Sequence, residues 1–222
     1  FDGFRTSHEV NKIEVLSYDV FDRLLDKEAV QKFRKRALNS ANPKTMGTAQ
    51  NDDVYFQAKE VQEQFYRPIP DIVNGYMQEI SKETGREYKP FNYYGAKDAT
   101  DIIVAMGSVT ETVKEVIDNL VAKGEKVGLI SVHLYRPFSS KYFFDVLPET
   151  VERIAVLDRT KESGSVGEPL YLDVKSIFYD REKQPAIIGG RYGLSSKDTT
   201  PAQIFAVYKN LKEKMKNNFT IG

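Results

Sequence analysis

The chain has 222 residues, with 32 Lys and Arg against 32 Asp and Glu, so its formal net charge at pH 7 is zero. This balance gives no bulk electrostatic attraction to nucleic acid or to an anionic membrane, and we expect neither as a partner. No apolar run reaches the roughly 18 residues of a membrane-spanning helix. The lack of cysteine excludes disulfides and thiolate-ligated metal from this sequence, and two histidines disfavour a His-rich metal site.

The first part of the chain predicts helices. Gly3 favours a turn, residues 12–16 a short strand, and residues 22–38 a helix, whereas residues 39–53 are rich in breakers and small polar side chains and favour a loop. The predicted helix carries a basic cluster that we interpret as a solvated face and not as a phosphate or nucleic-acid patch. That cluster consists of Lys32, Arg34, Lys35 and Arg36.

Two further apolar stripes at helical spacing precede the second half of the chain. One steps from Val54 to Phe65, and the other runs from Ile72 to Ile80, with Pro70 in its first turn and Gly85 as its stop. We expect these two helices to pack against each other in an antiparallel pair. The aromatic residues of 89–94 are expected to form a connector that packs on its own domain.

From Asp101 the pattern becomes regular. Residues 101–106 are apolar without polar alternation, as in a strand covered on both faces. Ser108 and Glu111 match a capping box. The helix that follows carries an apolar face and ends at Gly124; this face comprises Val109, Val113, Val116, Ile117, Leu120 and Val121.

The same succession repeats to the end of the chain. We expect strands at 126–134, 151–157 and 185–189, and helices at 139–147, from Pro169, and from Pro201 behind a Thr200 capping box. Alternating strands and helices require right-handed crossovers and a mostly parallel sheet. The predicted fold is a three-layer α/β/α domain with four or five strands.

Ligands of such sheets bind outside the carboxyl ends of the strands, so residues there are the candidate site residues. Ser108 lies at a helix start that could hold an anion, but the sequence has no G-x-G-x-x-G or Walker loop and Ser108 already has a capping role. His133 has no partner spacing that supports a general base. Alternation along its strand places His133 and Tyr135 on one face. It places Leu134 and Arg136 on the other.

Three arginines complete the candidate set. Arg136 could pair with a carboxylate or a phosphate. Arg159 follows Asp158, and we prefer a local ion pair between these two side chains. Arg191 follows two turn glycines and is interpreted as an interdomain residue. Because no pair of carboxylates is placed for acid–base work, we assign no catalytic residue and predict contacts between domains for Ser108, His133 and the three arginines.

Five stretches, taken together and in order, carry a family resemblance. They read FDGFRTSHE, REYKPFNYYGAKDATDIIVAMGSVTETVKEVID, KVGLISVHLYRPFS, RIAVLDRTKESGSVGEPLYLDV and GGRYGLSSKDTTPAQI. The chain closely resembles an internal slice of pyruvate:ferredoxin (flavodoxin) oxidoreductases, and both of its ends look cut. The resemblance implies that residues 1–62 end a thiamine-pyrimidine-type first domain. It implies that residues 63–222 form a domain similar to the C-terminal domain of transketolases, with the sheet core in 99–222.

The resemblance also implies the parent activity, namely oxidative decarboxylation of pyruvate with coenzyme A and transfer of electrons to ferredoxin or flavodoxin. Such enzymes use thiamine diphosphate, Mg²⁺ and [4Fe-4S] clusters, which the resemblance places in other domains, and this slice is expected to bind no cofactor and to be inactive alone. A cytoplasmic homodimer, in which this slice contacts the other domains of its chain, is implied as well.

Two alternatives to a structural module remain open. The chain could be a stand-alone α/β domain that binds a small molecule or an anion through Ser108 and the Gly190 loop. It could also be an interaction domain that recruits ferredoxin, although its neutral charge gives that hypothesis little support.

Overall fold

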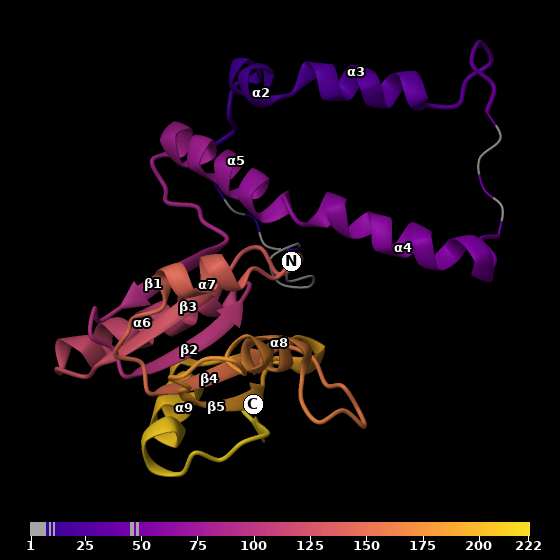
Figure 1. The fold of residues 1–222 in the computed structure, drawn as a ribbon. Helices are drawn as coiled ribbons and strands as arrows, with labels where there is room; N and C mark the ends of the chain where they lie inside the picture. Colours follow the sequence, from indigo (N-terminus) through magenta and orange to yellow (C-terminus); the bar gives the residue numbers. More distant parts are fainter. Residues whose placement is uncertain (1–7, 9, 11, 45–46, 48) are drawn as a thin grey trace. The chain divides into compact units, whose positions relative to one another are not determined.

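The computed structural model describes residues 8, 10, 12–44, 47 and 49–222, and the turn predicted at Gly3 lies outside these residues. The described chain falls into two compact units, one over residues 12–88 and the other over residues 89–222 together with residues 8 and 10 (Figure 1).

The first unit is helical and buries little within itself. Its helices are α2 (Tyr18–Leu24), α3 (Lys27–Arg36), α4 (Asp52–Tyr66) and α5 (Ile69–Thr84). The strand predicted at residues 12–16 is wrong, because this segment has no regular structure. The single helix predicted over 22–38 is also wrong. The Asp26 side chain accepts a hydrogen bond from the Ala29 amide at 2.9 Å, and this cap starts a new helix after α2.

Helices α4 and α5 follow each other along the chain and do not fold back. Arg67 and Pro68, which join them, both have right-handed helical backbone angles, so the chain continues in the direction of α4 (Figure 1). The predicted antiparallel pair is therefore wrong, although both helices and the stop at Gly85 are confirmed. Gly85 adopts φ 68°, a left-handed conformation that glycine takes without steric cost.

The second unit contains a six-stranded sheet in the order β1-β3-β2-β4-β5-β6. Strand β1 runs antiparallel to β3, and every other neighbouring pair is parallel. The strands are β1 (Phe91–Gly95), β2 (Asp101–Met106), β3 (Val127–Val132), β4 (Arg153–Asp158), β5 (Ala186–Arg191) and β6 (Phe219–Thr220).

Helices cover both faces of this sheet and give the three predicted layers. Helices α6 (Val109–Ala122) and α9 (Pro201–Glu213) pack over one face, and α7 (Ser140–Val146) and α8 (Pro169–Ile177) over the other. The alternation of β2 shows the division directly, since Ile103 belongs to the α6/α9 core and Ile102 to the α7/α8 core. The predicted fold class is confirmed, whereas the expected number of four or five strands is wrong, because the sheet has six.

Several local expectations are corrected in this unit. Residues 89–94 were expected to form a connector, whereas residues 91–95 form the edge strand β1. Val121 was expected on the buried face of α6, but its side chain is 37% exposed. The capping box at Thr200 is confirmed, with the Gln203 Oε1 atom accepting from the Thr200 amide at 2.8 Å.

Among the described residues, no helix combines the length and the apolar character that crossing a bilayer would require.

Candidate functional site

The carboxyl ends of the parallel strands surround a hollow of about 440 Å³. Three of the predicted site residues, Ser108, His133 and Arg159, line it together. The remaining lining residues come from the ends of β2, β3 and β4, from the start of α8, and from the residue after β5. They are Met106, Gly107, Val132, Tyr135, Asp158, Thr160, Pro169 and Tyr192.

Ser108 does not cap α6 in the predicted way. Its backbone is already helical, with φ −62° and ψ −24°, and its side chain forms no cap hydrogen bond. A capping side chain needs an extended backbone to reach the amides of the first turn. Instead, Gly107 makes the turn with φ 82°, and the Thr110 hydroxyl donates to the Gly107 carbonyl at 2.8 Å. The predicted Ser108–Glu111 capping box is therefore wrong.

His133 and Arg136 lie beyond the end of β3, which stops at Val132. The alternation predicted for residues 133–136 therefore does not apply, because the chain has left the sheet. The His133 Nδ1 atom lies 3.0 Å from the Lys89 carbonyl oxygen. Arg136 pairs with Asp173 on α8 at 2.7 Å, and its guanidinium lies 3.9 Å from the ring centroid of Tyr135.

Asp158 ends β4 and is 3% exposed. Its carboxylate accepts hydrogen bonds from the amides of Leu170 at 2.9 Å and Tyr171 at 3.1 Å, in the first turn of α8. Burial raises the pKa of this carboxyl, whereas the two amide bonds act in the opposite direction. Asp158 thus caps α8, and the Arg159 Nε atom donates to the Gly193 carbonyl at 3.0 Å.

We expect Asp158→Ala to lower the free energy of unfolding by about 2 kcal/mol, since it leaves two buried helix amides without an acceptor. Urea denaturation of the two proteins measures the difference. Glu115→Ala, on the exposed face of α6, is a control that should change stability by less than about 0.5 kcal/mol. Equal losses for the two variants would contradict the capping role.

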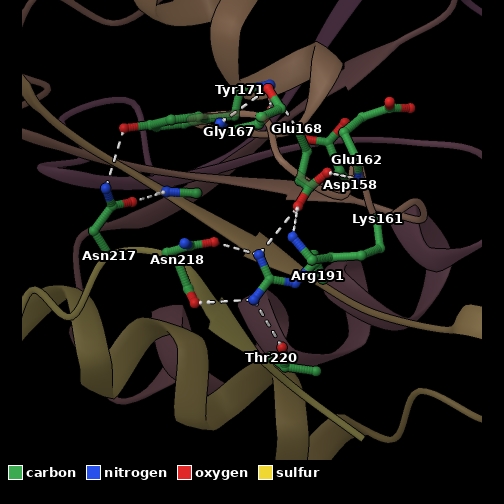
Figure 2. A network of polar contacts seen from close by, with 12 residues as sticks. Asp158, Lys161, Glu162, Gly167, Glu168, Tyr171, Arg191, Asn217, Asn218 and Thr220 are labelled. Atoms are coloured by element: carbon green, nitrogen blue, oxygen red, sulfur yellow. Dashed lines mark hydrogen bonds and ion pairs between the residues drawn. The ribbon is translucent and has the colours of Figure 1, made fainter.

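Beside the hollow, Arg191 is the centre of a polar network (Figure 2). Its guanidinium pairs with Glu168 at 3.1 Å and donates to the Asn218 carbonyl at 3.1 Å and to the Thr220 hydroxyl at 3.2 Å. It also contacts the Asn218 side chain. The network joins three segments that are distant in sequence, namely the end of β5, the start of α8 and the strand β6.

Glu168, which the sequence did not single out, is the acidic partner in this network and is 2% exposed. Burial alone would raise its pKa. The Glu162 amide, which donates to Glu168 Oε2 at 2.6 Å, and the cations of Arg191 and Lys161 outweigh burial, so that the pKa of Glu168 lies below its usual value. One feature of the sequence could have pointed to Glu168, namely that this carboxylate directly precedes Pro169 in the first turn of a helix.

The hollow offers few groups for acid–base chemistry, because its buried ionisable side chains have structural roles or stay protonated. Asp158 caps α8, and burial raises the pKa values of Tyr135 and Tyr192 to about 12, which keeps both phenols protonated at neutral pH. No group of three or more His, Cys, Asp or Glu side chains in the described part of the chain could hold a metal ion.

Comparison with known proteins identifies two family matches. Residues 99–204 match the pyruvate:ferredoxin oxidoreductase core domain II, and residues 1–78 match the thiamine diphosphate-binding domain of pyruvate flavodoxin/ferredoxin oxidoreductases. The chain is 56% identical to the pyruvate-flavodoxin oxidoreductase of Enterobacter agglomerans and 52% identical to the pyruvate:ferredoxin oxidoreductase of Moorella thermoacetica. Each alignment covers 100% of this chain and 19% of the relative.

Among solved structures, the chain is similar to a 2-oxoglutarate:ferredoxin oxidoreductase from Magnetococcus marinus, with 17% identity and a TM-score of 0.46. That alignment covers 81% of this chain and 28% of the other. The family assignment rests on the sequence relatives, since they align along the whole chain at about half identity or more. The chain belongs to the pyruvate:ferredoxin (flavodoxin) oxidoreductase family and spans about a fifth of the length of its curated relatives.

Proposed function

We propose that this chain is a non-catalytic structural module within a pyruvate:ferredoxin (flavodoxin) oxidoreductase. The parent enzyme decarboxylates pyruvate oxidatively, forms acetyl-CoA and CO₂ with coenzyme A, and reduces ferredoxin or flavodoxin. One observation carries this proposal, namely identity of 56% and 57% along the whole chain to two pyruvate-flavodoxin oxidoreductases that are about five times longer.

The non-catalytic role is supported by the chemistry of the strand ends. A general acid or base must be able to exchange its proton with a bound substrate. Here Asp158 accepts hydrogen bonds from two amides of α8. Glu168 accepts a hydrogen bond from the Glu162 amide and forms an ion pair with Arg191. The carboxylates that are buried at this edge of the sheet are thus committed to holding α8 and β6.

The cofactors of the parent are assigned to its other parts. The sequence has no cysteine to ligate a [4Fe-4S] cluster, and the described residues do not fit a Mg²⁺ site either, as they lack a suitable group of ligands. In the proposed division, residues 1–62 end the first domain and residues 63–222 form the second.

The proposal includes a cytoplasmic homodimer in which ferredoxin or flavodoxin binds to other domains. Of the five residues proposed for contacts between domains, Arg136 offers an exposed side chain, at 55%. The Arg191 side chain is 12% exposed and already has partners within its own unit. Arg136→Ala should therefore weaken the association between domains more than Arg191→Ala does.

Activity of the complete enzyme tests the proposal. We expect Ser108→Ala and His133→Ala to change kcat/KM for pyruvate by less than about threefold, because the proposed module places both side chains in contacts between domains and not at the reacting groups. A loss of about 100-fold in either variant, with thermal unfolding unchanged, would contradict the structural role.

Calorimetric titration of the 222-residue chain with coenzyme A, thiamine diphosphate and nucleotides distinguishes the structural module from the alternative, a stand-alone domain that binds a small molecule or an anion. Micromolar binding of one of them would favour an anion-binding domain.

A further inference from the structure

Loop 161–166, which leads from β4 toward α8, is exposed along its length but is held at its base by a buried side chain. The Glu162 amide donates to Glu168 Oε2 at 2.6 Å, and the Lys161 Nζ atom lies 3.6 Å from Glu168 Oε1. Thr160, directly before the loop, lines the hollow. The orientation of the Glu168 carboxylate therefore helps to set the position of a loop at the rim of the hollow.

Arg191 connects this carboxylate to the last strand of the sheet (Figure 2). Its guanidinium lies 3.1 Å from Glu168 Oε1, the oxygen that does not take the loop amide. The same guanidinium donates to the Asn218 carbonyl and to the Thr220 hydroxyl, and the Arg191 carbonyl accepts from the Ile221 amide at 2.9 Å. One residue thus binds both the base of the loop and β6.

Strand β6 is a short element whose docking depends on a few contacts. It has two residues and lies at the edge of the sheet, beside β5. The ring of Phe219, which packs against Gly190, anchors it from one face. Asn218, directly before it, has φ 59°, a left-handed conformation that persists in a residue with a side chain only where its surroundings hold it. Because Arg191 contacts both the carbonyl and the side chain of Asn218, release of the guanidinium favours undocking of β6.

We infer that loop 161–166 and β6 form a single conformational device, in which the ion pair between Glu168 and Arg191 transmits movement from one to the other. When β6 leaves β5, the guanidinium of Arg191 loses its acceptors in and before β6 and is released to turn away from Glu168. The carboxylate then loses its closest cation and its fixed orientation toward the Glu162 amide. Coupling of this kind is reciprocal. A group that contacts the loop from the hollow in the complete enzyme therefore also changes the docking of β6.

Hydrogen exchange in the complete gene product, followed by mass spectrometry of peptides, tests this coupling. Phe219→Ala removes an anchor of β6 that belongs to the α6/α9 core, whereas loop 161–166 leads into α8 on the other face of the sheet. Exchange should become about tenfold faster or more over residues 217–221, and faster by a similar factor over residues 160–167, because both segments open together. Phe219→Leu should give the same paired response at smaller size, and it replaces the alanine variant if that protein does not fold.

Two further variants separate the proposed link from general destabilisation. In an Arg191→Met background, Phe219→Ala should still speed exchange over residues 217–221 but should add nothing over residues 160–167. Leu120→Ala, the matched control, removes a buried side chain of α6 from the same core. It should leave both peptides unchanged, since their local opening does not require global unfolding.

A response of Phe219→Ala over residues 217–221 alone would overturn the inference, because the loop would then not follow β6. So would a response in neither peptide, since β6 would then not open by itself, or a loop response that persists without Arg191. Pyruvate turnover enters none of these measurements, so failure of the coupling and failure of the proposed function are distinguishable.

Discussion

Phe143→Ala is expected to lower the free energy of unfolding of the sheet unit by about 4 kcal/mol. The Phe143 ring is completely buried in α7, at the centre of an aromatic cluster. Its centroid lies 5.5 Å from that of Phe91 on the edge strand β1 and 6.0 Å from that of Phe178 after α8, and both contacts are edge-to-face. Truncation to alanine would leave a cavity between β1, α7 and α8, and edge-to-face contacts would be lost with it.

Guanidinium denaturation of the two proteins measures this loss. Phe205→Ala in α9 removes the same side chain from a position that is 46% exposed, and it should cost less than half as much. The loss at Phe143 should be accompanied by weaker hydrogen-exchange protection of β1, since Phe91 loses its neighbour. A cost at Phe143 no larger than that at Phe205 would show that the cluster contributes little to stability.

The regular parts of this fold follow from local sequence patterns. The stretch from Asp101 to Val132 combines a continuous apolar run, a helical stripe and a second apolar run, and it forms β2, α6 and β3 as expected. Each element is long enough for its hydrophobic period to be read without knowledge of its neighbours. The family resemblance stated from sequence is confirmed by the matches over residues 1–78 and 99–204.

The edges of the sheet could not be predicted in the same way. Strand β1 consists of Phe-Asn-Tyr-Tyr-Gly, and β6 has only two residues, so neither shows a clear period. Both become strands because a neighbour offers free backbone groups, β3 to β1 and β5 to β6. Pairing of this kind depends on tertiary contacts, which strand propensity does not encode.

The sequence predicted where the candidate site lies, but it did not predict the hydrogen bonds and ion pairs within the site. Three of the five expected residues line the hollow at the strand ends, as parallel topology requires. The partners of Asp158 and Arg191 lie 12 to 29 positions away along the chain. These residues meet only after α8 and β6 have docked. A prediction from neighbouring positions in the sequence therefore paired Asp158 with Arg159 and did not identify Glu168.

Arg191→Met is expected to lower the free energy of unfolding by about 3 kcal/mol at pH 7. The substitution keeps most of the side-chain volume but leaves Glu168, which is 2% exposed, without its closest cation. Lys161, whose Nζ atom is 3.6 Å from Glu168, remains and limits the loss. The hydrogen bonds that connect Arg191 to Asn218 and Thr220 are also removed, so β6 should lose hydrogen-exchange protection first.

The pH dependence of this loss identifies its cause. In the unmodified protein the pKa of Glu168 is lowered from its ordinary value of 4.5, so the ionised carboxylate contributes stability above that value, and the contribution disappears as the pH falls through the folded pKa. In Arg191→Met, the lowering effect of the Arg191 cation is lost, so the pKa of Glu168 rises and protonation of this carboxylate costs the variant less than it costs the unmodified protein. The difference in unfolding free energy should therefore be largest at pH 7 and shrink toward pH 4.

Two further variants separate the charge from the packing. Glu168→Gln combined with Arg191→Met removes both charges and should recover about half of the loss at pH 7, because no buried carboxylate remains unpaired. Lys82→Met breaks the exposed pair with Glu79 on α5, where the side chains are 70% and 49% exposed, and should cost less than about 0.5 kcal/mol at every pH. A loss in Arg191→Met that is the same at pH 4 and pH 7 would assign the effect to β6 docking alone. The ion pair with Glu168 would then make no net contribution to the fold.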